Sequence, residues 1–204
     1  MEKGASFKNL NTTPTPRFSK TRFTEFLVRE NEFYKLGFEE WVFWPGMLFN
    51  APDKWWGDQS RRDRPHEGLD LCLYKDRWNR ILRLDDKTKI PVMYDGVVVR
   101  IINDFIGQSV FIEHGLPDDN SRFLTIYGHT NPREGLRVGR MVKAGDIIAS
   151  LADSSKPKAD ILPHLHISVG KTSKFVSYKK LDWETIGVAD TLKLFNPLDV
   201  ISVS

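Results

Sequence analysis

A helical pattern of apolar residues lies near the start of the chain, at residues 21–36. Apolar and aromatic side chains recur there at mostly helical spacing, as on one face of an α-helix. These side chains are Phe23, Phe26, Leu27, Phe33 and Tyr34. We predict one amphipathic helix that ends near Gly37, because glycine commonly terminates helices. Its aromatic face is expected to dock on the main body of the protein, and a groove for a cofactor or partner is the alternative.

Beyond Pro45 and Gly46 the pattern changes to short β-rich runs separated by turn residues. The clearest strands are expected at residues 96–102, 109–113, 123–128, 146–151 and 165–169. Turn signals lie between them, at residues 115–120 and 143–146. Links of hairpin length cannot make parallel crossovers, so the strands are expected to pair antiparallel. We predict a mainly β chain, a compact antiparallel β-sheet or sandwich domain with a short N-terminal helix.

The first residues differ from the rest of the chain. Residues 1–20 are rich in Ser, Thr, Pro and Lys, which predicts an extended leader. No apolar stretch follows Met1, so no secretory signal peptide is visible in the chain as written. We therefore divide the chain into residues 1–43, with the leader and the amphipathic helix, and residues 44–204, which form the main domain.

Composition narrows the classes of function. Hydrophobic residues make up 40% and charged residues 28% of the chain, which is ordinary for a globular protein. A net charge of +3 is too small to indicate binding to nucleic acid or to a membrane surface. No apolar run has the length of a membrane-spanning helix, so an integral membrane protein is not expected. Cys72 is the single cysteine, and any metal must therefore be held by nitrogen and oxygen ligands.

Two histidines alternate with apolar residues at residues 163–169. In a strand, His164, His166 and Ser168 share one face, and the apolar residues between them share the other. The apolar face belongs to a core. The histidine face is expected to line something polar, because two neighbouring imidazoles gain little from packing. Two surface histidines without a function are the alternative.

A second segment places a histidine and a carboxylate four residues apart, at His66 and Asp70. On a helix they would share a face, but Pro65 and Gly68 favour a loop that leads into a strand. In such a loop, Gly68 would let the chain turn so that both side chains converge. The alternative is a variant of the helical His-Glu-x-x-His motif of zinc proteases, with Glu67 as the base.

The two remaining histidines are expected at strand ends. Strand alternation places His129 on the same face as Tyr127, beside Gly128, which lets other groups approach closely. By itself such a histidine would be structural more often than catalytic. His114 continues its strand in phase and leads into a turn, so we expect it to be a structural residue that caps the strand.

Taken together, these pieces resemble the lysostaphin-type zinc endopeptidases, bacterial cell-wall peptidases that cut peptidoglycan cross-links. The resemblance runs from about Trp44 to Val200. The segments that carry it are residues 66–70, 95–99, 110–115, 125–129, 138–148, 163–166 and 196–198. The order and spacing of so many pieces make the resemblance specific.

By this resemblance, one Zn²⁺ per chain would be bound by His66, Asp70 and His166, while His129 and His164 would be catalytic residues outside the metal shell. Two nitrogens and one carboxylate leave a fourth position open for water, as in catalytic zinc sites. Zinc-bound water would attack the scissile bond with the assistance of the two histidines. The implied function is a zinc metalloendopeptidase that hydrolyses peptide cross-links or bridges of bacterial peptidoglycan.

The same resemblance implies the setting of the protein. Residues 44–204 would form the zinc peptidase domain, and its substrate implies a location in the cell envelope or outside the cell. We expect a monomer whose partner is a peptidoglycan peptide, without nucleic acid and without membrane insertion. One alternative function is a catalytically silent peptidoglycan-binding relative that regulates another cell-wall hydrolase. Another is a structural zinc site closed by four protein ligands.

Several features depart from the family pattern. Residues 154–162 replace a stretch that is usually rich in Gly and Thr, the segment 71–89 is longer than usual, and Thr130 stands where leucine is common. These changes are expected to reshape the substrate groove. Trp55 and Trp56 are expected either to wall this groove or to lie in the core. A basic strip, either a solvated strand edge or a contact for anionic wall polymers, comprises Lys171, Lys174, Lys179 and Lys180.

Overall fold

The structure is a computed structural model that describes residues 19–115, 121–154, 161–173, 176–188 and 191–204. Its regular elements are mostly strands, and all strand pairs are antiparallel in the described part of the chain. The predicted mainly β fold class with one short α-helix is confirmed. Some sequence-based expectations lie outside the described residues, namely those for the leader up to residue 18, for turn residues 116–120, for loop residues 155–160 and for Lys174.

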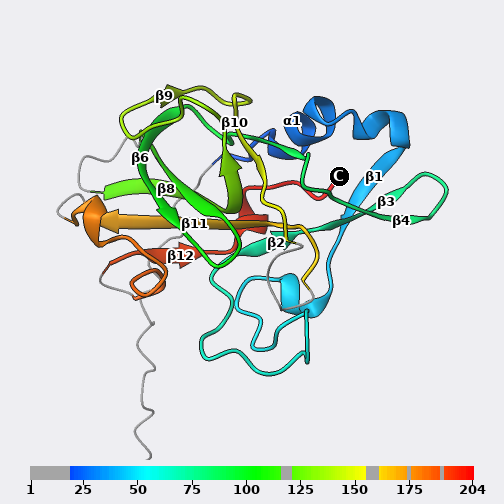
Figure 1. Ribbon diagram of the computed structural model, residues 1–204, viewed down its shortest axis with the longest axis horizontal. Coiled ribbons are helices and arrows are strands. Elements are labelled where there is room, and N and C mark those ends of the chain that lie inside the picture. Colours follow the sequence, from blue (N-terminus) through cyan, green and yellow to red (C-terminus); the bar gives the residue numbers. More distant parts are fainter. Residues whose placement is uncertain (1–18, 116–120, 155–160, 174–175, 189–190) are drawn as a thin grey trace, which may run out of the picture.

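The larger sheet has the strand order β12-β11-β8-β7-β6-β9, with β11 as the long strand across the view in Figure 1. These strands are β12 (Lys193–Phe195), β11 (Leu165–Ser173), β8 (Ser121–Pro132), β7 (Gln108–His114), β6 (Gly96–Asn103) and β9 (Met141–Val142). Three more strands join them, β10 (Ile147–Leu151) on β8, β5 (Lys89–Pro91) on β10, and β2 (Leu69–Leu71) on β11. All five predicted strands are therefore present, as β6, β7, β8, β10 and β11.

A smaller sheet has the order β1-β3-β4 and consists of β1 (Phe38–Val42), β3 (Leu73–Asp76) and β4 (Ile81–Arg83). The sequence pattern did not predict these strands, nor β2, β5, β9 and β12. Strands of two to five residues contain too few side chains to display an alternation that can be distinguished from a loop. Short 3-10 helices lie at Phe33–Leu36, Pro45–Met47, Tyr178–Lys180 and Pro197–Asp199.

The predicted N-terminal helix is present but divided. Helix α1 (Phe23–Glu30) ends where the Asn31 side-chain amide donates hydrogen bonds to the carbonyls of Leu27 and Lys89, both at 2.9 Å. A 3-10 helix follows, and the segment ends at Gly37, whose φ of 78° is a left-handed conformation that glycine adopts readily. The prediction of a single helix over residues 21–36 is thus wrong, because the helix is interrupted after Glu30. The predicted end near Gly37 is correct. No helix in the described segments is long and apolar enough to cross a membrane.

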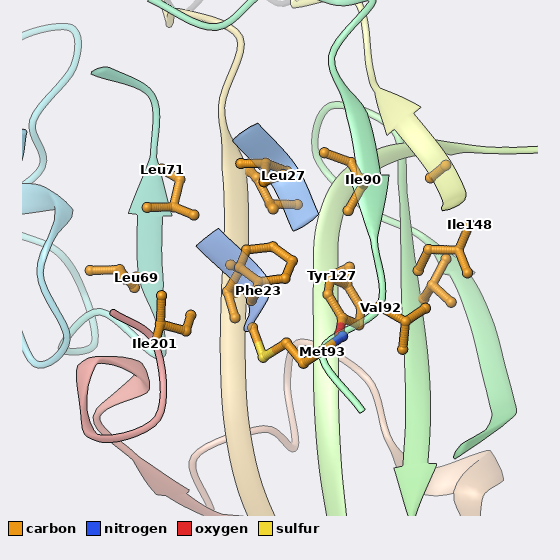
Figure 2. Close-up of a cluster of buried hydrophobic side chains, with 14 of the residues drawn as sticks. Phe23, Leu27, Leu69, Leu71, Ile90, Val92, Met93, Tyr127, Ile148 and Ile201 are labelled. Atoms are coloured by element: carbon orange, nitrogen blue, oxygen red, sulfur yellow. The ribbon is translucent and has the colours of Figure 1, made fainter. Parts of the chain in front are cut away.

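The aromatic face of α1 docks on the main body, as predicted. Phe23 and Leu27 are fully buried and point toward Tyr127 of β8 in Figure 2. The rings of Phe23 and Tyr127 have centroids 6.3 Å apart. Because α1 packs into the same core as the sheet, it fixes one face of β8 and β11. The other face of β8 packs in a second cluster, which comprises Phe111, Leu124, Ile126, Leu181, Ile186 and Leu192.

His114 ends β7 as a buried residue outside the histidine cluster described below. Its Nδ1–H donates to the Asp95 carbonyl at 2.8 Å, and its Nε2 accepts from the Thr125 hydroxyl at 2.8 Å. Both ring nitrogens of the neutral imidazole are therefore satisfied. Burial lowers the pKa of His114 to about 4, although the bond to Asp95 acts in the opposite direction. These contacts agree with the structural role predicted from its place in the sequence.

We predict that His114 makes folding stability depend on pH. An unfolded histidine takes up its proton near pH 6.5, whereas the folded His114 has a pKa of about 4. The unfolded state therefore binds more protons in this window, and stability falls as the pH drops through it, by about 3 kcal/mol for this shift. Urea unfolding measures the free energy of unfolding at pH 7 and at pH 4. The decrease between the two pH values should be about 3 kcal/mol smaller in His114→Gln than in the wild type. Equal differences in both proteins would refute this assignment.

Candidate metal centre

Three side chains proposed from the sequence meet at one point of the structure, those of His66, Asp70 and His166. The pairing of β2 with β11 places Asp70 directly opposite His166. His66 lies in the loop before β2, where its backbone N–H donates to the Ala51 carbonyl at 3.0 Å. Segments that are 96 residues apart in sequence are thus joined by ordinary antiparallel strand pairing. All three side chains are buried.

The ligand atoms of these three residues face one another. His66 Nε2 lies 3.1 Å from Asp70 Oδ1 and 3.1 Å from His166 Nδ1, and His166 Nδ1 lies 2.9 Å from Asp70 Oδ1. A tetrahedral zinc ion with bonds of about 2.0–2.1 Å needs ligand atoms about 3.3 Å apart. The donor set, two imidazole nitrogens and one carboxylate oxygen, and its spacing therefore fit a zinc ion. Among the described residues, this is the group of His, Cys, Asp and Glu side chains that converges in this way.

The outer atoms of the same side chains are held by neighbours. His66 Nδ1 donates to the Leu48 carbonyl at 3.0 Å, so His66 Nε2 keeps its lone pair for the cluster. His166 Nε2 lies 2.9 Å from the Ser168 hydroxyl, and the Trp55 indole N–H donates to Asp70 Oδ2 at 2.7 Å. Partners of this kind orient metal ligands in proteins. The cluster is therefore oriented before any ion binds.

The electrostatics leave the cluster in the protonation states that a metal requires. Burial by itself would raise the pKa of Asp70, but the imidazoles of His66 and His164 and the hydrogen bond with His166 hold it well below its usual range. Burial lowers the pKa of His166 to about 4 and that of His164 to about 3, against the attraction of Asp70. Near neutral pH, Asp70 is thus a carboxylate and the imidazoles of His166 and His164 are neutral, which are the forms that bind metal ions.

His164 stands beside the cluster. Its Nδ1–H donates to the Leu162 carbonyl at 2.8 Å, and its Nε2 lies 4.0 Å from Asp70 Oδ1. The Trp55 ring meets the imidazole edge to face at 5.1 Å, and Trp56 stacks on it at 6.4 Å. Trp55 is 5% exposed and belongs to a buried cluster, whereas Trp56 lines the pocket. The expected position in the core therefore holds for Trp55, and the expected position in the groove wall holds for Trp56.

The side chain of His129 also lies beside this cluster, because of a bulge in β8 that the sequence did not predict. Strand β8 contains one extra residue against β7, between the pairs Tyr127–Val110 and Thr130–Gln108. His129 lies in this bulge with a φ of 60°. Its ring lies against His164, with centroids 4.7 Å apart, and not on the core face of Tyr127. The expected strand alternation was therefore wrong at His129, because a one-residue bulge exchanges the faces of a strand.

The helical zinc-protease alternative is wrong for this chain. Residues 65–68 form a loop and Asp70 lies in β2, so His66 and Asp70 do not share a helical turn. Gly68 lies so close to β11 that an added Cβ atom would stand 2.3 Å from the Ile167 carbonyl oxygen. The predicted convergence at Gly68 is therefore confirmed, and it depends on the absence of a side chain there. Glu67 lines the pocket but does not belong to the converging group.

A pocket of about 290 Å³ contains the five site residues predicted from the sequence. Four of its other lining residues were not foreseen there, namely Arg62, Asp104, Phe105 and Trp183. They come from loops whose sequences have no recognisable periodicity, and only the folded chain brings them to the site. Of the lysine strip, Lys171 lies in β11 between β8 and β12, and Lys179 and Lys180 are exposed in a 3-10 helix. The expected strand edge is therefore wrong, and a contact with anionic wall polymers stays a prediction.

Fold and site together define a β-sheet domain whose pocket contains a buried histidine–aspartate group able to hold a metal ion. A family model described as peptidase family M23 matches residues 80–178. This match confirms the lysostaphin-type resemblance for the segment between residues 80 and 178. The matched segment includes His129, His164 and His166, whereas His66 and Asp70 precede it. No curated protein matches the chain in sequence.

Several solved structures are similar to the chain. The catalytic domain of the antimicrobial peptidase lysostaphin from Staphylococcus simulans has 17% sequence identity and a TM-score of 0.43, over 82% of this chain and 94% of that domain. LytU has 21% identity and a TM-score of 0.39, over 76% of this chain and 97% of its own. The catalytic domain of the prophage-encoded M23 protein EnpA from Enterococcus faecalis has 21% identity and a TM-score of 0.37, over 66% and 87%.

Proposed function

We propose that the protein is a zinc endopeptidase that hydrolyses peptide cross-links or bridges of bacterial peptidoglycan. One observation carries this proposal. In a chain that a model of peptidase family M23 matches over residues 80–178, two imidazole nitrogens and one carboxylate oxygen lie within 3.1 Å of one another, in a pocket that two further histidines line. The reaction adds one water across one amide bond and yields a carboxylate and an amine.

In this proposal, His66, Asp70 and His166 hold one Zn²⁺ per chain. Bound zinc would supply Lewis acidity, which lowers the pKa of water to about 7 and polarises a peptide carbonyl. The three protein ligands leave a tetrahedral ion one open position, as catalytic rather than structural sites do. Their buried hydrogen bonds to Leu48, Ser168 and Trp55 keep the ligands oriented.

The other two histidines have the roles of proton carriers. His164 donates its Nδ1–H to the Leu162 carbonyl, so its Nε2 carries a lone pair. This nitrogen lies on the pocket side of the ring, near Asp70. His129 lies edge to face with His164 and is partly accessible within the pocket. Proton transfer by residues so placed removes a proton from the attacking water and donates one to the leaving amine.

The lining of the pocket combines aromatic surface with a few charged side chains, which suits a peptide substrate. Trp56, Phe105 and Trp183 provide aromatic surface on its walls, and Arg62 is the basic side chain among them. Phe105 is 65% exposed and is therefore available to a ligand. A peptidoglycan substrate implies that the protein acts in the cell envelope or outside the cell. We further propose that residues 44–204 act as the peptidase domain and that the protein works as a monomer.

The direct test is digestion of purified peptidoglycans with different cross-links, followed by mass spectrometry of the released fragments. Cleavage should require zinc, stop with a chelator and resume when zinc is restored. His129→Ala and His164→Ala should each lower the rate by about 10² to 10³-fold, as expected for general acid–base residues. Both variants should keep one zinc per chain, because neither residue belongs to the converging group.

A matched control is His114→Gln, which removes a histidine that lies outside the pocket. At neutral pH it should cleave at the wild-type rate. A zinc-loaded wild type that cleaves no wall type would contradict the proposed enzyme and favour a silent peptidoglycan-binding relative. X-ray absorption spectroscopy that finds four protein ligands on zinc would favour the structural alternative.

A further inference from the structure

Asp104 begins the turn that joins β6 to β7, at the edge of the pocket. Its Oδ1 accepts hydrogen bonds from the backbone N–H groups of Ile106 at 3.0 Å and Gly107 at 2.7 Å. These bonds form a common turn in which an aspartate carboxylate binds the backbone two and three residues ahead. The side chain of Asp104 is only 1% exposed, which is unusual for a carboxylate whose role is to form a surface turn.

The same carboxylate also binds His129, which is 25 residues further along the chain. Asp104 Oδ2 accepts the backbone N–H of His129 at 2.8 Å, and Oδ1 lies 3.2 Å from His129 Nδ1. One carboxylate thus contacts both the backbone and the ring of a single histidine. The backbone contact holds the main chain of His129 in place, and the ring contact orients its imidazole.

The backbone contact has a reason in the bulge of β8. His129 adopts a φ of 60°, a left-handed conformation that is uncommon for residues other than glycine. In the bulge, its N–H has no partner in the ladder with β7, because the extra residue lies between two ladder pairs. Asp104 supplies the acceptor for this N–H. The conformation that moves His129 away from the core face therefore depends on a side chain of the neighbouring hairpin.

The ring contact determines which nitrogen of His129 carries the proton. Burial alone would raise the pKa of Asp104, but hydrogen bonds from His129, Ser109 and Gly107 hold it well below its usual range. An ionised carboxylate only accepts hydrogen bonds. The facing Nδ1 of His129 must therefore be the N–H donor, so in the neutral form of the ring Nε2 is the nitrogen with the lone pair.

A second pair of contacts supports Asp104 from behind. The Ser109 hydroxyl donates to Asp104 Oδ2 at 2.5 Å, and the Trp183 indole N–H donates to the Ser109 oxygen at 3.1 Å. Trp183 also meets the His166 ring edge to face, with centroids 5.0 Å apart. The carboxylate that contacts His129 is thus itself held by side chains that reach the metal-binding group.

We propose that Asp104 is the positioning residue for His129. It holds the histidine backbone in the bulge and its ring in the Nδ1–H form, so that Nε2 is the nitrogen that exchanges protons in the pocket. His164 receives the equivalent orientation from the Leu162 carbonyl. The consequence for catalysis rests on the proposed endopeptidase function, whereas the consequence for the ring of His129 does not.

The ring is tested first, by ¹⁵N NMR of the imidazole nitrogens in the zinc-loaded wild type and in Asp104→Asn. The wild type should have His129 in the Nδ1–H form. The variant should lose this preference, because an amide does not require a donor at Nδ1. A wild-type His129 in the Nε2–H form would overturn the proposal, and this measurement needs neither a folded variant nor an activity.

Activity is tested second, with peptidoglycan fragments as substrate. Asp104→Asn should lower kcat by about 10²-fold with little change in KM. This is the loss expected when a catalytic side chain, here that of His129, is displaced by about 1 Å. Its zinc content should stay at one per chain. The matched control is Asp76→Asn. Asp76 is also a fully buried carboxylate that accepts backbone N–H groups in a hairpin turn, those of Trp78 at 3.0 Å and Arg80 at 2.9 Å.

Asp76→Asn should lose stability as Asp104→Asn does, but keep the His129 nitrogen pattern and kcat. Equal falls of kcat in the two variants would overturn the proposal, because the loss would then follow from a weakened turn. An unchanged kcat in Asp104→Asn would overturn it as well. If the wild type cleaves no peptidoglycan, the proposed function fails, and the NMR result alone decides the role of Asp104.

Discussion

Asp70→Asn is expected to abolish metal binding while leaving the fold in place. The substitution keeps the size of the side chain but removes its charge, and it leaves a neutral amide oxygen, a weak zinc ligand, in place of the carboxylate. Zinc affinity should fall by about 10⁴-fold or more, since a two-histidine remnant is a poor zinc site. Titration with zinc and a competing chelator measures this directly. Peptidoglycan cleavage, if present in the wild type, should fall to the level of the chelated enzyme.

The same variant should lose the stabilisation that zinc gives. A ligand present at about 1,000 times its dissociation constant stabilises the folded state by about 4 kcal/mol. The melting temperature of the wild type should therefore rise with zinc, and that of Asp70→Asn should not. Glu67→Gln is the matched control, because Glu67 is a neighbouring acid of the same loop outside the converging group. Loss of zinc in Glu67→Gln, with retention in Asp70→Asn, would refute the ligand assignment.

Gly68→Ala is expected to disrupt the metal centre by sterics alone. The new methyl group would stand 2.3 Å from the Ile167 carbonyl oxygen and 2.5 Å from Nε2 of His166. The carbonyl belongs to β11 and cannot move without breaking the pairing that places Asp70 opposite His166. We expect a loss of about 3 kcal/mol in unfolding free energy. Zinc affinity should fall by about 10³-fold, because His166 is displaced from its ligand position.

The control for Gly68→Ala is Gly115→Ala. An added Cβ at Gly115 meets no atom within 4 Å, and no left-handed conformation is required there. Denaturant unfolding and zinc titration should both give wild-type values for this control. If Gly68→Ala also behaves as the wild type, then β2 and β11 tolerate a wider separation than the structure has, and the spacing of the ligand atoms is not determined by this contact.

Much of the site was accessible from the sequence because its residues lie in local patterns. The alternation at residues 163–169 assigned the histidines and the apolar residues of β11 to opposite faces, and the structure keeps that division. Pro65 and Gly68 argued for a loop before a short strand, which the structure contains. Such patterns can be read from sequence because strand and turn geometry depend on a few neighbouring residues.

Other features could not be read in this way. The end of helix α1 depends on Asn31, whose side-chain amide donates a hydrogen bond to the Lys89 carbonyl, 58 residues away in the sequence. The bulge at His129 depends on Asp104, which belongs to another hairpin. Neither residue belongs to a periodic pattern. An interpretation from local sequence therefore extended the helix beyond Glu30 and assigned His129 to the wrong face of β8.

The sequence by itself determined the mainly β class, the main strands, the family resemblance and the five candidate side chains, because each of these depends on residue types at short and regular spacing. Only the tertiary structure decided that His66, Asp70 and His166 converge, that Trp55 is buried while Trp56 lines the pocket, and that Asp104 holds His129. Pairing between distant strands brings these groups together, and the energy of each contact depends on atoms that lie close in space but far apart in the chain.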